Sequence, residues 1–263
     1  LQATMEVQLY QPSLSVRYNL AKNPASFLRK VVELMAMGTG FPAFHNDEVG
    51  IRMLLNKGVP LSEAWDWNPC GCVETNLEGR LRQYTDLADI NLGSVIELAL
   101  TNGYCRKSGE KISVSSGDPL SFATYEEFKE AVKAQLRHII HATVAGSHLL
   151  DEIGKERPVP ALSFTFKECI EKGLDYSVGG AKYNCGNGVI MIGVADLVNS
   201  MAAIRQLVYE DKSVAMADLL AALAADFDGY PEIKALCDAA PKYGNDDPRV
   251  DDLVGEMFTF IAD

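Results

Sequence analysis

The sequence has few of the features that mark membrane, secreted or nucleic-acid-binding proteins. No apolar run approaches the roughly 18 residues that a membrane-spanning helix needs. Residues 1–6 show neither the basic start nor the apolar core of a signal peptide. Lysine and arginine number 24 against 36 acidic residues, which leaves a formal net charge of −12. Because phosphate binding needs clustered basic residues, we expect no nucleic-acid partner, and because no long apolar run is present, we expect no membrane partner.

Cysteine is also scarce, with six residues in a chain of 263. That is too sparse for a disulfide scaffold, so reduced thiols in the cytoplasm are the simpler interpretation. Hydrophobic residues make up 48% of the chain, enough to bury a sizeable core in one or two domains. We find no internal repeat, no low-complexity segment and no obvious linker.

One stretch, residues 68–80, combines reactive side chains with backbone breakers. It places the thiol of Cys72 two residues before the carboxylate of Glu74. Pro69, Gly71 and Gly79 surround the pair, which disfavours a plain helix. In an extended loop, side chains two residues apart point to the same side, so both can face one substrate. A sulfur that attacks carbon or carries an electron, beside a proton carrier, is a catalytic pair. The alternative is a buried structural thiol beside a surface acid.

The rest of the pattern predicts a helix-rich α/β fold. Alternation of apolar and polar residues predicts short strands at 7–10, 14–18, 81–85 and 111–115. Residues 158–163, with two prolines, form either a rigid connection or a further strand. Apolar stripes at helical spacing, with capping residues such as Thr124 and either Asn46 or Asp47, predict helices between them. The expected helices begin near residues 24, 47, 62, 91, 125, 163, 189, 216, 232 and 250.

The other reactive residues have simpler, structural interpretations. We interpret His45 as a hydrogen-bonded histidine near a helix start rather than a catalytic group. His138 and His141 lie three apart on a helix that also carries His148, but no neighbouring acid or cysteine completes a metal site, so we predict none. Cys185 lies in a glycine-rich turn, where a packed thiol is the simpler interpretation.

Several ordered motifs resemble those of the glycyl radical enzymes, the pyruvate formate-lyase-like superfamily. Residues 71–74, Gly-Cys-Val-Glu, resemble the family's cysteine loop. Residues 41–49 are similar to its Pro…Asn-Asp-Glu segment, and residues 179–184 with 193–204 to its glycine turn and following helix. Residues 241–247 match again near the end, so the resemblance covers most of the chain.

The resemblance implies a fold that composition and spacing do not. Members of the family form a ten-stranded α/β barrel of two parallel halves, with the reactive cysteine on an inner loop. Family chains are about three times as long, and their C-terminal Arg-Val-x-Gly-aromatic motif, which holds the radical glycine, does not occur here. We therefore expect residues 1–263 to be an internal portion of a pyruvate formate-lyase-like domain, without the glycine radical domain.

The resemblance also implies the chemistry. A separate activating enzyme, using S-adenosylmethionine and an iron–sulfur cluster, installs the glycyl radical, which then passes to Cys72 as a thiyl radical. The thiyl abstracts hydrogen from a small substrate while Glu74 serves as general acid and base. Oxygen must be excluded, which implies anaerobic metabolism. No bound cofactor is expected, and the full-length enzyme is expected to be a homodimer.

Glu74 points to one branch of the family. Pyruvate formate-lyases have two adjacent cysteines, whereas this chain has Gly71 before Cys72. They also bind the carboxylate of pyruvate with an arginine, and the matching position in this chain is Ala88. The Cys-x-Glu form resembles dehydratases, lyases and arylacetate decarboxylases, which break C–O, C–N, C–S or C–C bonds. The alternatives are acetyl transfer from pyruvate, or an inactive fragment or assembly subunit. The substrate is not specified, and we expect the nearby Arg80, Arg82, Tyr84 and Asn184 to be structural.

Overall fold

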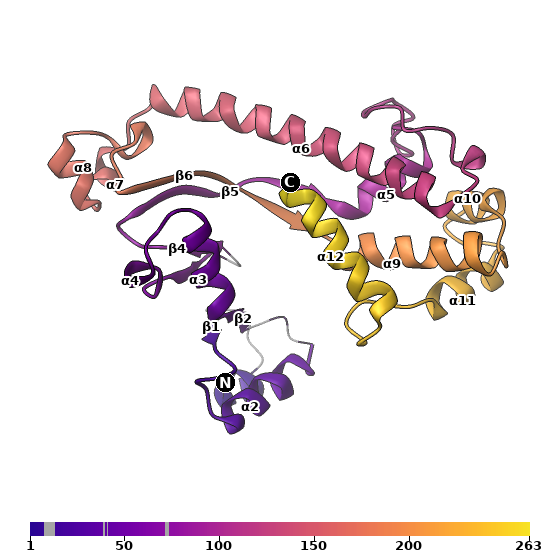
Figure 1. Ribbon diagram of the computed structural model, residues 1–263, viewed down its shortest axis with the longest axis horizontal. Helices are drawn as coiled ribbons and strands as arrows, with labels where there is room; N and C mark the ends of the chain where they lie inside the picture. The colour runs from indigo at the N-terminus through magenta and orange to yellow at the C-terminus, as the bar shows by residue number, and fades with distance from the viewer. Residues whose placement is uncertain (8–13, 39, 41, 72–73) are drawn as a thin grey trace. The chain divides into compact units, whose positions relative to one another are not determined.

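The computed structural model describes residues 1–7, 14–38, 40, 42–71 and 74–263 (Figure 1). The chain forms two compact units. Unit 1 comprises residues 1–87 and 149–188, and unit 2 comprises residues 88–148 and 189–263. The division falls within strand β5 (Leu81–Asn91), near the C-terminal end of helix α6 (Tyr125–Lys155) and within strand β6 (Tyr183–Ile192).

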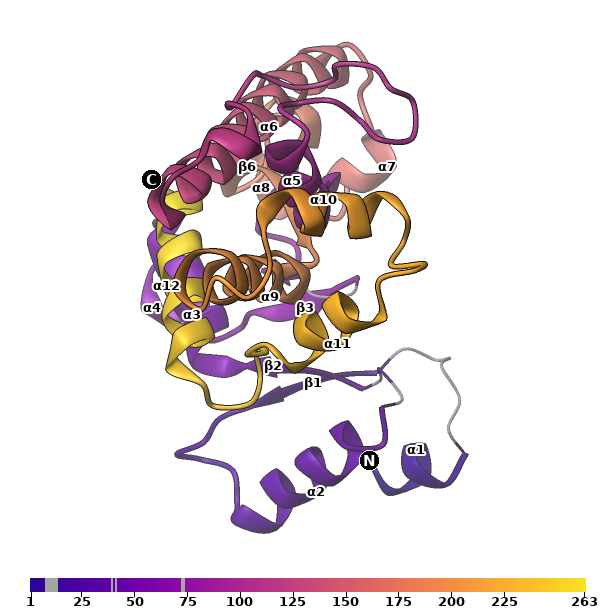
Figure 2. The same ribbon diagram turned by 90° about the vertical axis from the view of Figure 1, so that its right-hand side faces the viewer.

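Unit 1 contains a pair of parallel strands. Strand β1 (Ser15–Tyr18) pairs with β2 (Ala43–Asn46), and the register sets Arg17 opposite His45. Helix α2 (Ala25–Met35) connects them, as parallel strands require a crossover, and it follows Pro24 as expected (Figure 2). The strand predicted at residues 7–10 is wrong at Val7, the last residue of helix α1 (Gln2–Val7), and otherwise lies outside the described residues.

Helix α3 (Asp47–Asn56) begins directly after β2. The side chain of Asn46 accepts a hydrogen bond of 2.9 Å from the backbone N–H of Glu48, so Asn46, and not Asp47, is the cap. A short helix, α4 (Leu61–Ala64), follows. The buried faces of these helices form the main core of unit 1, in which Leu54 and Trp67 are almost fully buried.

Strands β3 (Asn68–Cys70) and β4 (Glu74–Asn76) form an antiparallel hairpin that carries the cysteine motif. Unit 1 also contains α7 (Pro160–Ser163), α8 (Lys167–Lys172) and the 3₁₀ turn η2 (Tyr176–Val178). The strand considered at residues 158–163 is therefore wrong, because a proline at the first helical position begins α7 instead.

Unit 2 is helical around one core. Helix α9 (Val194–Ile204) continues into a π-helical turn, η3 (Arg205–Glu210), and both α5 (Leu92–Leu100) and α12 (Pro248–Ala262) pack on α9 (Figure 2). The N-terminal part of α6 adds Phe128, Val132 and Leu136 to the same core. Around these helices lie η1 (Pro119–Ser121), α10 (Met216–Ala224) and α11 (Pro231–Ala239).

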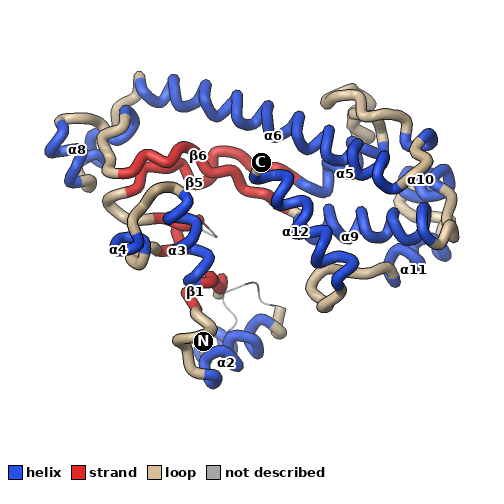
Figure 3. The backbone as a smooth tube through the Cα atoms, in the orientation of Figure 1, coloured by secondary structure: helices blue, strands red, loops and turns tan. Residues whose placement is uncertain are grey.

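Strands β5 and β6 pair with each other (Figure 3). A helix was expected from residue 189, but residues 189–192 belong to β6, and α9 starts only after Gly193. The strand expected at 111–115 is reduced to an isolated bridge between Tyr104 and Lys111. The helix-rich α/β class is confirmed. Within the described ranges, no helix is both long and apolar enough to cross a membrane.

Candidate active site

The cysteine motif lies on the β3–β4 hairpin. Cys72 and Val73 fall outside the described residues, but both flanks are in place. Cys70, the last residue of β3, is opposite Glu74, the first residue of β4. Both side chains are half-buried. The hairpin therefore fixes where the backbone enters and leaves the segment that contains Cys72.

Gly71 and the Glu74 side chain are closely fitted to each other. The backbone of Gly71 has φ +61°, a conformation that favours glycine. A Cβ atom at this position would lie 2.7 Å from Oε1 and 2.8 Å from Oε2 of Glu74. The carboxylate of Glu74 thus folds back over the bare backbone of Gly71. Any larger residue at position 71 would force this carboxylate to move.

A buried aromatic and ionic cluster supports the hairpin. Trp67, which is 1% exposed, immediately precedes β3. Its Nε1 donates a 2.9 Å hydrogen bond to Oδ1 of Asp47, and Nε of Arg17 donates to the same oxygen at 2.9 Å. The guanidinium carbon of Arg17 lies 4.5 Å from the Trp67 ring centroid, and Arg17 also donates to the Trp67 carbonyl. This cluster ties β1 and α3 to the start of the hairpin.

The cluster also determines the charge state of Asp47. Burial acts to raise the pKa of this carboxyl, but hydrogen bonds from Arg17 and Trp67 outweigh it and hold the pKa below its ordinary value. Asp47 therefore stays ionised at neutral pH and neutralises the charge of Arg17. Sequence reasoning missed this cluster, because Arg17, Asp47 and Trp67 are 20 to 50 residues apart and no local pattern connects them.

His45 lies on the edge of Trp67. The two ring centroids are 6.3 Å apart in an edge-to-face arrangement. Burial lowers the pKa of His45, and the negative charge of Glu74 opposes that shift. Sequence reasoning assigned His45 a hydrogen-bonded structural role, but no hydrogen bond to its Nε2 occurs among the described residues.

The other residues expected near the motif bind parts of unit 1. Arg80 pairs with Asp66 at 2.9 Å, and Arg82 pairs with Asp151 at 2.8 Å. The side-chain amide of Asn184 donates to the carbonyl of Ala181 at 3.0 Å. These contacts agree with structural roles. The side chain of Tyr84 lies outside the described part of the structure.

The remaining reactive residues are placed elsewhere. Cys185 packs against the Trp67 core, and burial raises the pKa of its thiol despite the opposing charge of Lys57, which disfavours a reactive thiolate. His138, His141 and His148 are exposed on α6. Within the described residues, no three histidine, cysteine or acidic side chains gather as metal ligands would.

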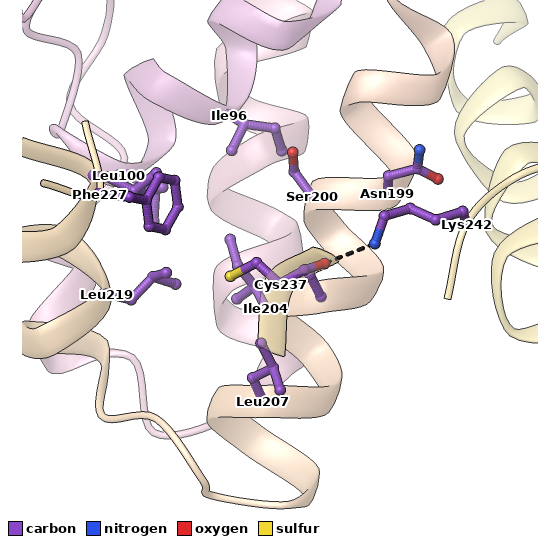
Figure 4. Close-up of a pocket in the computed structure, with 12 residues that line it drawn as sticks. Ile96, Leu100, Asn199, Ser200, Ile204, Leu207, Leu219, Phe227, Cys237 and Lys242 are labelled. Carbon is purple, nitrogen blue, oxygen red and sulfur yellow. Dashed lines mark hydrogen bonds between the residues drawn. The ribbon is translucent and has the colours of Figure 1, made fainter. Parts of the chain in front are cut away.

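Unit 2 contains a cavity of about 250 Å³ that involves none of the motif residues (Figure 4). Its walls are mainly apolar and come from α5, α9 and α10, with Ile96, Ile204 and Leu219 among them. On one side, Nζ of Lys242 donates a 2.7 Å hydrogen bond to the carbonyl of Cys237. The charged amine of Lys242 therefore stabilises the C-terminal end of α11.

Comparison with known proteins assigns the chain to a family. The model for "Pyruvate formate lyase-like" proteins matches residues 1–263. Trans-4-hydroxy-L-proline dehydratase of Clostridioides difficile is 37% identical over 255 residues, which cover 96% of this chain and 32% of that protein. An isethionate sulfite-lyase of Oleidesulfovibrio alaskensis is 30% identical over 98% of this chain and 31% of its own length.

Comparison with solved structures supports the same family. The B12-independent glycerol dehydratase of Clostridium butyricum, in its glycerol-bound form, superposes with a TM-score of 0.84 at 35% identity, covering 98% of this chain and 33% of that one. The chain thus spans about a third of the length of the relatives it matches. The match runs along the whole chain and includes radical dehydratases, lyases and a decarboxylase subunit. The chain therefore belongs to the pyruvate formate lyase-like family of glycyl radical enzymes.

Proposed function

We propose that this chain is the cysteine-loop portion of a glycyl radical lyase that breaks a C–O, C–N, C–S or C–C bond in a small organic substrate. The observation that carries the proposal is the fit between Gly71 and the Glu74 carboxylate on the hairpin that bears the motif. The relatives support the same kind of chemistry, since they include a hydroxyproline dehydratase, a sulfite-lyase and a decarboxylase subunit. Cys72 and Glu74 are the proposed catalytic residues.

In the proposed mechanism, a glycyl radical in another part of the protein supplies the unpaired electron when it is present. The thiol of Cys72 gives its hydrogen atom to that glycine and becomes a thiyl. The thiyl takes a hydrogen atom from a substrate carbon, which reforms S–H and leaves a carbon radical. Because the S–H bond is weak, both transfers are nearly balanced in energy. After the bond breaks, the product radical takes the hydrogen atom back from Cys72.

Glu74 would handle the protons of the same cycle. For a vicinal hydroxyl substrate, its carboxylate accepts the hydroxyl proton next to the carbon radical, and the carboxylic acid then protonates the leaving group on the adjacent carbon. The leaving group departs with its bonding electron pair, and the remaining electron stays on the product radical. Electrons and protons balance, and Glu74 returns to its starting state without any added oxidant.

The geometry weighs against acetyl transfer from pyruvate. A second cysteine at position 71, which pyruvate formate-lyases have, would place its Cβ 2.7 Å from the Glu74 carboxylate. A thiol at 71 and this placement of the carboxylate therefore exclude each other. Ala88, in strand β5, also offers no cation for the carboxylate of pyruvate.

The proposal includes the surroundings of the site. The ten-stranded barrel, with Cys72 on its inner loop, would be completed by parts of the protein outside this chain. The radical would be installed by a separate activating enzyme that uses S-adenosylmethionine and an iron–sulfur cluster. We further propose that the full-length enzyme is a cytoplasmic homodimer, that it works without oxygen, and that it binds no other cofactor.

The test begins with the intact mass of the natural protein. A mass near 28.7 kDa would favour the second candidate, an inactive or assembling subunit, because residues 1–263 do not contain the family's Arg-Val-x-Gly-aromatic motif. A mass about three times larger would support the enzyme. The anaerobically activated protein is then assayed with trans-4-hydroxy-L-proline, glycerol and isethionate, the compounds named for its relatives.

Variants then separate the roles. With the substrate that is turned over, Cys72→Ala and Glu74→Gln should each abolish turnover. The matched control is Cys105→Ala, which removes a thiol from a loop of unit 2 and should retain it. Full activity in Cys72→Ala would overturn the proposal.

A further inference from the structure

The cavity in unit 2 has a charged group in a mainly apolar wall, and the proposed chemistry at Cys72 does not use it. The volume of the cavity is about 250 Å³. In another protein, an engineered apolar cavity of about 150 Å³ stays dry and binds benzene. The cavity of unit 2 is therefore large enough for an organic molecule the size of a substituted ring.

The inner wall of the cavity is apolar and belongs to the core of unit 2. Its side chains come from α5, α9, η3 and α10. The following lining residues are each between 3% and 9% exposed: Ile96, Leu100, Ala203, Ile204, Leu207 and Leu219. Ordered water needs two to four polar partners, which this part of the wall does not offer. A molecule with an apolar body therefore fits the inner part better than water does.

Phe227 contributes to the wall from an unusual backbone conformation. Its φ is +60°, in the left-handed region that bulky side chains rarely adopt. Its N–H donates a 2.7 Å hydrogen bond to the carbonyl of Ala222 just beyond the end of α10, and its half-buried ring lines the cavity (Figure 4). Backbone strain of this kind is found where a side chain is held against a ligand. The position of the ring is thus imposed by the chain, which gives the cavity a preformed wall.

The charged part of the wall is Lys242. Its Nζ donates 2.7 Å hydrogen bonds to the carbonyls of Cys237 and Ala240 (Figure 4). The next residue, Tyr243, donates its backbone N–H to the side-chain oxygen of Asn199 at 2.8 Å, which fixes this segment against α9. An ammonium group has three N–H donors. Two of them are used, so one remains for a further acceptor.

The positive charge of Lys242 is not balanced by an acidic side chain. Both of its acceptors are neutral carbonyl oxygens. Asp238, near the end of α11, pairs with Lys234 at 2.6 Å, and Asp247 pairs with Arg249 at 2.6 Å. In the part of the chain that the structure describes, no carboxylate forms an ion pair with Lys242. A half-buried cation without a counter-ion favours an anionic ligand.

We propose that this cavity binds a small carboxylic acid with an aromatic or branched hydrocarbon body, whose carboxylate pairs with Lys242. The hydrocarbon body contacts the apolar wall at Ile204 and Leu219, and the carboxylate accepts the remaining N–H of the ammonium group. The binding is noncovalent. All lining residues belong to unit 2, so the proposal does not depend on the chemistry proposed for Cys72.

The first test compares two probes of nearly the same shape that differ in charge. The binding of benzoate and of benzamide to the full-length protein is measured by isothermal titration calorimetry. Benzoate should bind about tenfold more tightly, because a hydrogen bond to a charged group is stronger than one between neutral groups. Equal affinities for the two probes, or no binding of benzoate at millimolar concentration, would overturn the proposal.

The second test removes the charge. Lys242→Met keeps an unbranched apolar side chain but has no ammonium group, so the affinity for benzoate should fall about tenfold while that for benzamide stays the same. Retained binding of benzamide shows that the cavity is intact. The matched control is Lys234→Met, which removes an exposed amine from α11 and should leave both affinities unchanged. Loss of both probes in Lys242→Met, or an equal fall for benzoate in both variants, would overturn the proposal.

The third test shows whether the probe lies in this cavity. Ala203 lines the cavity from α9, and Ala203→Leu fills part of the space that the ring of the probe needs. Binding of both probes should be lost, while the far-UV circular dichroism of the variant stays that of the parent. Benzoate that binds Ala203→Leu as tightly as the parent lies elsewhere in the protein, for example in the substrate site, and this result would overturn the proposal.

Discussion

Gly50 offers a sharp test of the packing behind the candidate site. It lies buried in the middle of α3, with the Trp67 indole directly against its backbone. A Cβ atom at Gly50 would lie 2.4 Å from Cε2 and 2.5 Å from Cζ2 of Trp67, well inside van der Waals contact. Glycine in a helix normally costs about 1 kcal/mol relative to alanine. We predict that Gly50→Ala nonetheless destabilises the protein, because the indole has no room.

The expected loss of stability depends on how the Trp67 indole responds to the added methyl group. Overpacking a well-filled core costs about 1–3 kcal/mol. If the ring moves instead, Trp67 loses its 2.9 Å hydrogen bond to the ionised Asp47, and bonds to charged groups contribute about 1.5–3 kcal/mol. These two costs are alternatives and do not add. After the gain in helix propensity of about 1 kcal/mol is subtracted, Gly50→Ala should lower the free energy of unfolding by about 1 kcal/mol, and by about 2 kcal/mol at most.

Urea unfolding measures the effect. Far-UV circular dichroism follows both units, and tryptophan fluorescence follows unit 1, which contains both Trp65 and Trp67. The control is Gly146→Ala on α6, where no atom lies within 4 Å of the added Cβ. The same substitution there should stabilise the protein by about 0.5–1 kcal/mol.

A double variant tests the cause. In a Trp67→Phe background the benzene half of the indole that meets the new Cβ is absent. Gly50→Ala should then cost little or become stabilising. An equal loss of stability in both backgrounds would refute the reasoning, as would a Gly50→Ala protein as stable as the parent.

Three further predictions concern other sites. Burial alone would raise the pKa of Asp175, but hydrogen bonds from Ser177, Ser163 and Val159 lower it to about 2. The ionised Asp175 should therefore stabilise unit 1 above about pH 4, and this contribution should be lost as the pH falls toward 2. Asp175→Asn should therefore cost about 1–2 kcal/mol at pH 7 and nearly nothing at pH 2, measured by urea unfolding at each pH. Gly71→Ala should lower kcat at least about tenfold without changing the radical yield measured by EPR, because it displaces the Glu74 carboxylate; wild-type turnover would contradict this. Asn91→Ala should cost about 0.5–2 kcal/mol in thermal unfolding by removing the 3.3 Å cap on the Ser94 N–H, and an unchanged melting temperature would show that the cap contributes nothing.

The sequence predicted best those features that depend on a few neighbouring residues. A cap at Asn46 or Asp47 was visible because capping needs only the next two or three N–H groups, and the structure shows that Asn46 is the cap. The start of α6 was visible for the same reason, since Thr124 and Glu127 exchange hydrogen bonds as a capping box.

Features that depend on distant partners were misread or missed. Residues 189–192, Val-Ile-Met-Ile, fit a buried helix as well as a strand, and the pairing of β6 with β5 decides the outcome. Residues 111–115 alternate like a strand but find no strand to pair with among the described residues, so only one bridge forms. Local alternation predicts a strand only where an edge is available to it.

In the candidate site, too, features set by neighbouring residues could be predicted and features set by distant contacts could not. Cys72 and Glu74 could be picked out because their spacing is local, and the Gly71 contact explains the glycine between Cys70 and Cys72. The placement of His45 beside Trp67 could not be predicted. It depends on the β1–β2 register and on the position of the hairpin, which no short pattern records.

The central claim is that Cys72 carries hydrogen between substrate and glycine. It is tested most directly by activating the intact protein without oxygen and recording the EPR signal of its glycyl radical in H₂O and in D₂O. A thiol exchanges its hydrogen with solvent, so transfer through Cys72 should replace the α-hydrogen of the glycine with deuterium and narrow the signal. We predict this exchange in the parent protein and its loss in Cys72→Ala. Exchange at the parent rate in Cys72→Ala, or no glycyl radical in the parent, would contradict the account.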